Sequence, residues 1–105
     1  MNNDFYIIEI IKKVVVSYFH IAEQDLRAKD KSKKVVYARH IGMYLCRKLT
    51  SETYPRIGLE FGGRDPKTVI YAYNKIDKSL KSNTQLVSDV KEITSQVTNL
   101  LQKSF

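Results

Sequence analysis

The stretch Ile57-Gly58-Leu59-Glu60-Phe61-Gly62-Gly63-Arg64-Asp65-Pro66-Lys67-Thr68-Val69 carries the strongest structural signal in this 105-residue chain. The Gly62-Gly63 pair permits a sharp turn, because glycine adopts positive φ without penalty. Asp65 is a favourable N-cap, and Pro66 suits the first helical position, where a missing N–H has no partner to lose. The stretch therefore predicts the end of one helix, a tight turn and the start of a second helix.

The first turn of that second helix is predicted to be exposed and polar. It carries Lys67 and Thr68 and follows Arg64 directly. Free backbone N–H groups with added cations suit a phosphate or a DNA groove. Two helices over residues 53–61 and 66–81, joined by a glycine turn, predict a helix-turn-helix, although many helical proteins contain such a pair without binding DNA.

The rest of the chain is predicted to be helical as well. All four glycines fall between residues 42 and 63, so the flanks are free of them and favour long helices. The valines at 14–16 are locally strand-like, but no region shows sustained period-two alternation. We therefore predict one all-α domain over residues 1–105, a Trp-repressor-like bundle of about six helices, at 3 or 4–19, 22–28, 35–50, 53–61, 66–81 and 83–103.

Apolar residues recur at three- and four-residue steps along these helices, which predicts their buried faces. Arg39, His40, Arg47 and Lys48 fall largely off the stripe of their helix. The residues predicted to point inward are Phe5, Ile8, Ile11, Val15 and Tyr18 or Phe19; Val36, Ala38, Ile41, Leu45 and Leu49; Ile57 and Phe61; Val69, Ala72 or Tyr73, Ile76 and Leu80; and Leu86 or Val87, Val90, Ile93, Val97 and Leu100 or Leu101.

The charge balance points to polyanionic partners. The net charge is +7 and the pI is about 9.5, as is common for domains that meet nucleic acid or acidic lipid. Residues 27–34, Arg-Ala-Lys-Asp-Lys-Ser-Lys-Lys, form a basic stretch that we expect to be an exposed loop. It is either a solvated connector or a segment that neutralises phosphates and inserts a lysine into a minor groove.

The sequence offers little for other functions. Its two histidines, His20 and His40, lie in different predicted helices, and its single cysteine, Cys46, is expected to be a small core residue. No catalytic constellation, metal site or cofactor motif is evident, so we predict a non-enzymatic protein. No apolar run is long enough for a membrane span, and a cytoplasmic protein is expected.

Two blocks of this sequence resemble the bacterial DnaA family. Residues 38–50, Ala-Arg-His-Ile-Gly-Met-Tyr-Leu-Cys-Arg-Lys-Leu-Thr, resemble its R-Q-I-A-M-Y-L-x-R-x-L-T run. Residues 57–69 are similar to its I-G-x-x-F-G-G-R-D-H-T-T-V signature, and the resemblance extends over about residues 8–78. It implies the C-terminal helical domain of a replication initiator, which recognises duplex DNA boxes of the TTATNCACA type.

The resemblance also implies roles for individual residues. Lys31 aligns with a cation that enters the minor groove, and residues 65–68 align with a run that reads bases in the major groove. Arg39 and His40 align with an Arg-Gln pair at the DNA surface, and Arg47 with a backbone contact. The predicted DNA-binding residues are therefore Lys29, Lys31, Lys33, Lys34, Arg39, His40, Arg47, Arg64, Asp65, Pro66, Lys67 and Thr68.

The chain departs from the family pattern where bases are read. Pro66 replaces the family's His and has no side-chain donor, and Lys67 replaces a Thr. Lys67 can donate to guanine or hold a phosphate, whereas the methyl group that could touch thymine is gone. His40 replaces Gln, and Lys31 replaces the usual Arg. We expect the scaffold to be kept and the base preference to be altered.

We therefore predict a monomeric, nucleoid-associated protein that binds duplex DNA at a DnaA-box-like site. The alternative is a free-standing regulatory or protein-interaction module without the initiator ATPase, which binds DNA only weakly and non-specifically. Aromatic residues without an inward role, such as Tyr54, Tyr71 and Phe105, favour this alternative and a protein partner.

Overall fold

The computed structural model describes residues 3–29 and 31–103, and all regular structure in these ranges is helical. The all-α prediction is confirmed, but the described chain has five α-helices rather than about six. In order, the elements are α1 (Asp4–Phe19), the 3₁₀-helix η1 (Glu23–Leu26), α2 (Lys33–Leu49), α3 (Tyr54–Glu60), α4 (Pro66–Ser79) and α5 (Thr84–Lys103).

The helix predicted over residues 22–28 is only the short 3₁₀-helix η1. His20 ends α1 in the left-handed conformation, with φ of 56°, so the chain turns sharply just before this segment. The Asp25 carboxylate accepts the Ala22 N–H at 2.8 Å, which closes a single tight turn. The locally strand-like valines at residues 14–16 lie within α1, so the prediction of a helix over residues 3 or 4–19 is confirmed there.

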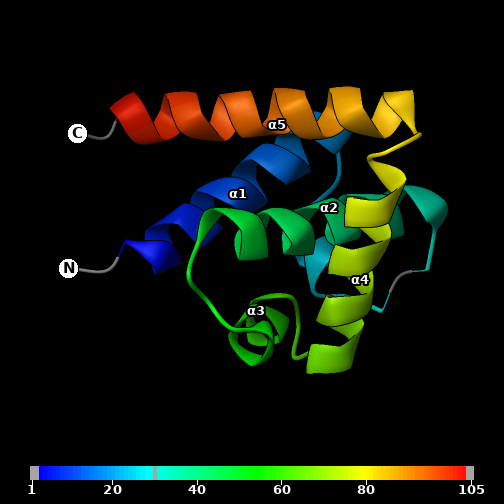
Figure 1. Cartoon of the computed structure of the whole chain (residues 1–105). Helices are drawn as coiled ribbons and strands as arrows, with labels where there is room; N and C mark the ends of the chain where they lie inside the picture. The colour runs from blue at the N-terminus through cyan, green and yellow to red at the C-terminus, as the bar shows by residue number, and fades with distance from the viewer. Residues whose placement is uncertain (1–2, 30, 104–105) are drawn as a thin grey trace.

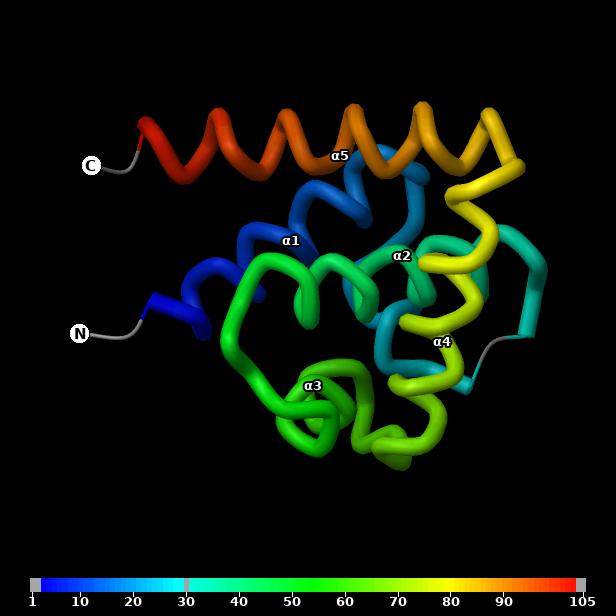
Figure 2. Tube along the Cα trace, in the orientation of Figure 1, coloured from blue at the N-terminus to red at the C-terminus, as the bar shows by residue number. Residues whose placement is uncertain are grey.

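The helices form two layers that meet at α2 (Figures 1 and 2). Helix α5 lies along α1 on one side, and α2 packs against both α1 and α4. Helix α3 packs against α4 at the other side, so the predicted helix-turn-helix forms one end of the molecule. A bilayer-spanning segment requires a length and hydropathy that no described helix combines.

The core is centred on α2. Ala38, Ile41 and Leu45 are each no more than 1% exposed, as their spacing predicted, and Cys46 is fully buried among them. Phe61, from the turn after α3, is also fully buried, and its ring lies against Gly42. A Cβ at Gly42 would stand 3.0 Å from Cε2 of Phe61, so the glycine makes room for this ring.

The inward stripe of α1 begins one residue earlier than predicted. Phe5 is 57% exposed, whereas Asp4 is 8% exposed and its carboxylate accepts the Ser51 N–H at 3.2 Å. The helical register through Val15, Ile11 and Ile8 reaches Asp4 rather than Phe5. The loop after α2 covers this position, so a polar residue that satisfies a backbone N–H is buried there.

A charged side chain also joins α1 to the helix-turn-helix. Lys12 is 5% exposed, and its Nζ lies 3.0 Å from a carboxylate oxygen of Glu60, the last residue of α3. Burial alone would lower the pKa of Lys12, but its hydrogen bonds to Glu60 and Glu9 outweigh burial and raise this pKa. The pair fixes the orientation of α3 relative to α1.

A buried carboxylate attaches α5 to the other helices. Asp89 of α5 is 5% exposed and accepts hydrogen bonds from the hydroxyl of Tyr18 at 2.8 Å and that of Tyr37 at 2.7 Å. Gln85 donates a third, at 3.0 Å. The bond to Asp89 is the main cause that raises the pKa of Tyr18, and burial is the main cause for Tyr37. We call this group the Asp89 anchor.

Candidate nucleic-acid interface

The turn between α3 and α4 is built by glycines that the backbone requires. Gly62 and Gly63 have φ of 88° and 76°, as the sequence predicted. The carbonyl of Gly58 accepts the N–H groups of Gly63 at 3.0 Å and Arg64 at 2.9 Å, which closes the turn. A Cβ at Gly58 would stand 2.2 Å from the Arg64 carbonyl oxygen, so no other residue fits without backbone movement.

The basic loop lies directly on this turn. A Cβ at Gly62 would stand 2.3 Å from the carbonyl oxygen of Arg27, so the two backbones touch at a position where only glycine fits. Arg64 donates to the carbonyls of Leu26 and Arg27 at 3.4 Å, and also to those of Ala28 and Phe61. The start of the loop is therefore held to the helix-turn-helix by a single side chain.

A second arginine completes this attachment from α2. Arg39 is 5% exposed, and its guanidinium donates to the carbonyls of Asp25 at 3.0 Å and Ala28 at 3.1 Å. The carbonyl end of a helix is its negative pole, which makes this a favourable place for cations. Burial, followed by the nearby charge of Arg39, lowers the pKa of Arg64. We call Arg39, Arg64 and the four carbonyls of residues 25–28 the arginine clamp.

The first turn of α4 is capped and exposed as predicted. The carboxylate of Asp65 accepts the N–H of Lys67 at 2.8 Å, and Pro66 occupies the first helical position. Lys67 and Thr68 are exposed, whereas Pro66 is half-buried. Because Asp65 already accepts a bond from its own helix, its main contribution is to fix where this turn begins.

Sequence reasoning missed an apolar neighbour of this turn. Ile70 is 37% exposed and lies four residues after Pro66, on the same face of α4. Its position off the stripe of Val69, Ala72 and Ile76 was the available signal, because those three are buried and Ile70 cannot share their face. The exposed end of α4 thus presents a cation, a hydroxyl and an apolar group together.

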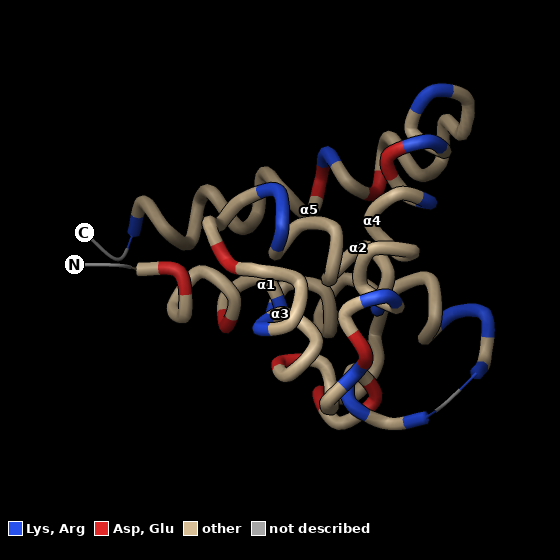
Figure 3. The backbone as a smooth tube through the Cα atoms, turned by 60° about the horizontal axis from the view of Figure 1, so that its bottom comes forward, with Lys and Arg blue, Asp and Glu red and all other residues tan. Residues whose placement is uncertain are grey.

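The predicted basic loop supplies four exposed lysines beside the clamp. Lys29 and Lys31 lie on the loop, and Figure 3 shows basic positions along this part of the chain. Lys33 and Lys34 belong to the first turn of α2, so the helix begins two residues earlier than predicted. We call Lys29, Lys31, Lys33 and Lys34 the lysine segment.

The remaining two predicted contacts lie away from the first turn of α4. His40 is half-buried, and its ring lies 6.1 Å from that of Tyr71, in the middle of α4. Burial, followed by the charges of Lys75, Arg39 and Arg64, lowers the pKa of His40. This environment favours the neutral imidazole.

Arg47 lies near the other end of α2, about 21 Å along the helix axis from Lys33. It donates to the Glu52 carbonyl at 2.7 Å and lies 4.7 Å from the centre of the Tyr54 ring. Tyr54 also contacts the ring of Tyr73, so it is a packed residue rather than a free aromatic surface. Tyr71 is 58% exposed, and Phe105 lies outside the described residues.

The described residues contain no group of three His, Cys, Asp or Glu side chains that could hold a metal ion. Cys46 is fully buried, and burial raises the pKa of its thiol, so it is the core residue that the sequence predicted.

Two consecutive helices, a glycine turn and an exposed, capped first turn of the second helix define this chain as a helix-turn-helix protein. Residues 8–76 match the family described as "Bacterial dnaA protein helix-turn-helix". The chain belongs to this family.

Similar full-length proteins agree with this membership. The chain is 46% identical over 90 residues to the chromosomal replication initiator protein DnaA of Lactiplantibacillus plantarum. It is 47% identical over 88 residues to the protein of the same name in Levilactobacillus brevis. These matches cover 86% and 84% of this chain but 20% of each relative, so the chain spans about a fifth of their length.

Proposed function

We propose that this chain binds double-stranded DNA at a DnaA-box-like site and reads a base sequence that differs from the usual box at one or two positions. Membership of the DnaA helix-turn-helix family supports DNA binding of this type. The observation that carries the proposal is the arginine clamp, which joins the lysine segment to the exposed first turn of α4.

In the proposed mechanism, some residues position the protein on the DNA backbone and others read the bases. The first turn of α4 enters the major groove, where Lys67 donates to a guanine or a phosphate and Thr68 to a base edge. Ile70 would lie against a thymine methyl group one helical turn further along, which supplies an apolar contact that Pro66 and Lys67 do not. Lys31 would enter the adjacent minor groove, and the other lysines would displace counterions from phosphates.

Arg39 and Arg64 take a different role from the one their sequence alignment implied. Both guanidiniums donate to backbone carbonyls, so we propose that they position the lysine segment rather than read bases. We further propose that the protein acts as a monomer on cytoplasmic DNA and catalyses no reaction.

The test is a titration against a fluorescent duplex that carries a TTATNCACA-type box and against a shuffled duplex, each at a low and a higher salt concentration. We expect a preference for a box-like sequence that persists at the higher salt concentration, because base contacts are less screened than phosphate contacts. Selection from a randomised duplex pool then identifies the altered positions.

Equal binding to both duplexes that disappears with salt would contradict sequence-specific recognition. It would favour the alternative of a regulatory or protein-interaction module with purely electrostatic DNA binding. Tyr71, which is exposed on α4, is the residue that most favours this alternative.

A further inference from the structure

A cleft of about 430 Å³ lies beside the DNA-binding end, between the start of α2, the second half of α4 and the start of α5. Its floor is apolar and is formed by Val36, Tyr37, Ile76 and Leu86. This volume is within the range of sites that enclose one or two large side chains or a small ligand. The cleft belongs neither to the arginine clamp nor to the first turn of α4.

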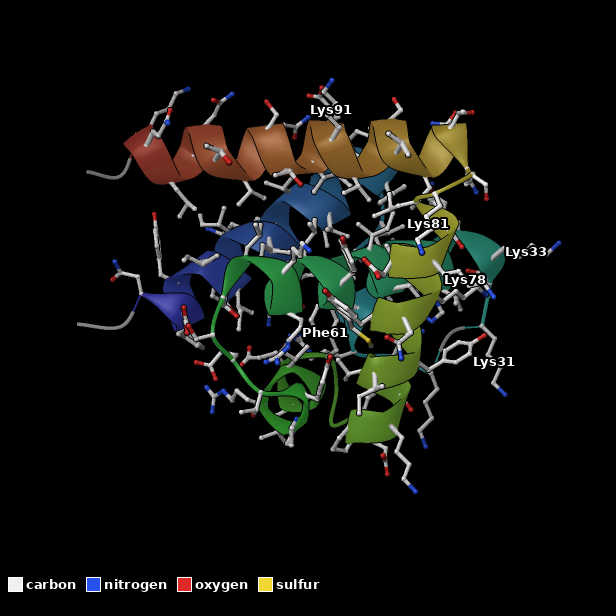
Figure 4. All side chains as sticks on the ribbon, viewed as in Figure 1. Lys31, Lys33, Phe61, Lys78, Lys81 and Lys91 are labelled. Carbon is white, nitrogen blue, oxygen red and sulfur yellow. The ribbon has the colours of Figure 1, made fainter. Side chains whose placement is uncertain are left out.

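The rim of the cleft carries positive charge. Lys31, Lys33 and Lys75 all line it, and none of the described residues that line it is acidic. These lysines come from three separate places: the loop, the first turn of α2 and the second half of α4. Figure 4 shows Lys31 and Lys33 extending from the loop side of the molecule, beside α4.

His40 also lines the cleft and is affected by the nearby positive charges. Burial and the charge of Lys75 are the first two causes that lower its pKa, followed by Arg39 and Arg64. The groups that face His40 are the Tyr71 ring and Lys75 from α4, together with the two arginines of the clamp. An anion in the cleft would relieve this repulsion and raise the pKa of His40.

We propose that this cleft binds an acidic peptide segment, with one bulky apolar side chain on the floor and carboxylates on the three rim lysines. A simple inorganic anion would make no use of the apolar floor. A peptide would bury a large apolar side chain there, and this burial would be the main source of its affinity for the cleft. Cations spread over three segments match carboxylates spread along a peptide better than the compact charge of one phosphate.

Occupation of the cleft would exclude DNA, if the proposed function holds, because Lys31 and Lys33 serve both surfaces. The ligand would therefore act as a competitor that mimics the charge of DNA and adds an apolar contact that DNA lacks. Binding of the peptide itself does not depend on the proposed function, so the two can fail separately.

The first experiment is selection from a random peptide display library against the intact chain, with counter-selection against the Lys75→Glu variant. Lys75 is exposed, so this variant keeps the fold while reversing a charge at the rim. We expect a consensus of Asp or Glu around one Phe, Leu, Ile, Met or Trp. No enrichment, or a consensus without either the acidic or the apolar component, would overturn the proposal.

The second experiment measures the selected peptide by fluorescence anisotropy. Replacing its apolar residue by Ala should weaken binding at least about tenfold, since a buried apolar side chain is lost. Ser79→Phe, which fills the cleft, should weaken binding by a similar factor, and Lys75→Ala by about threefold. Lys78→Ala, on the same helix but outside the lining, is the matched control and should change binding less than twofold.

A competition experiment tests whether peptide binding in the cleft and DNA binding exclude each other. Adding the preferred duplex should displace the peptide, and adding peptide should raise the pKa of His40 as followed by NMR. Peptide affinity that is unchanged by both Ser79→Phe and Lys75→Glu would overturn the proposal, since the peptide would then bind elsewhere. If the chain binds no duplex at all, the proposed function fails while the peptide titrations remain decisive for the cleft.

Discussion

Each end of the molecule is attached to the rest by charged side chains, and the two ends use charges of opposite sign. At one end the carboxylate of Asp89 accepts the hydroxyls of Tyr18 and Tyr37 and attaches α5. At the other end Arg39 and Arg64 donate to backbone carbonyls and attach the basic loop. Asp89 accepts hydrogen bonds from neutral hydroxyl and amide groups, and both arginines donate to neutral backbone carbonyls, so each end is held by charge-assisted hydrogen bonds.

The two attachments hold different parts of the molecule. Asp89 belongs to α5, whereas the arginine clamp holds residues 25–28 at the start of the basic loop. Removing the Asp89 anchor should therefore affect stability alone, and removing the arginine clamp should affect stability and DNA binding together.

The largest expected effect is that of Asp89→Ala. It leaves two partly buried tyrosine hydroxyls without their charged acceptor, which should cost about 3 to 4 kcal/mol in the free energy of unfolding. Thermal unfolding followed by circular dichroism should show a midpoint lowered by roughly 10–20 °C. Glu92→Ala removes an exposed carboxylate from the same helix and is the control.

Duplex affinity of Asp89→Ala, measured well below its unfolding temperature, should stay within about twofold of the original value, since only the α5 end is altered. A marked loss of duplex affinity in the folded variant would contradict the prediction that the Asp89 anchor affects stability alone.

Arg39→Met should have the next largest effect. Methionine keeps the apolar stem but leaves carbonyls of Asp25 and Ala28 with one donor fewer, at a cost of about 2 to 3 kcal/mol. Duplex affinity should fall as well, because the lysine segment is no longer held in place. Arg56→Met removes one exposed cation from α3 without touching the clamp, and a similar affinity loss in both variants would show that only net charge matters.

Lys67→Ala tests whether Lys67 reads a base or only holds a phosphate. Lys67 is exposed, so stability should change by less than about 0.5 kcal/mol. Sequence preference should change by roughly 1–3 kcal/mol at one or two base pairs in a competition binding assay. An equal loss on every duplex would identify Lys67 as a phosphate contact only.

Lys31→Ala has the smallest expected effect. Binding should weaken on every duplex, and the slope of log affinity against log salt concentration should decrease by about one unit, because one phosphate-linked counterion fewer is released. An unchanged slope would remove Lys31 from the DNA interface.

The local signals in the sequence were sufficient for the turn and the helices. Asp65 and Pro66 act through their own backbone, and Gly62 and Gly63 through their φ angles, so their effect can be recognised without tertiary information. The buried face of α4 also followed from spacing, and so did Ala38, Ile41 and Leu45 of α2. At the start of α2 the prediction is wrong, since Val35 rather than Val36 is buried there.

The interior role of the charged residues could not be predicted in the same way. Arg39 and Lys12 are buried because distant groups satisfy them, namely carbonyls 11 and 14 residues away for Arg39 and a carboxylate 48 residues away for Lys12. Helical periodicity predicts which apolar residues are buried, but it does not predict which distant polar groups will bind a charged side chain of the same helix. For the same reason the alignment of Arg39 with a DNA-surface residue did not reveal the clamp.

The near-contact between Gly58 and the Arg64 carbonyl has a consequence for how this domain can evolve. The glycines and Arg64 are fixed by the backbone, whereas Lys67 and Thr68 project from the first turn of α4 and lie outside the packed core. If the proposed function holds, substitutions at Lys67 and Thr68 would change the base preference at little cost in stability, whereas the glycines of the turn would have to stay unchanged.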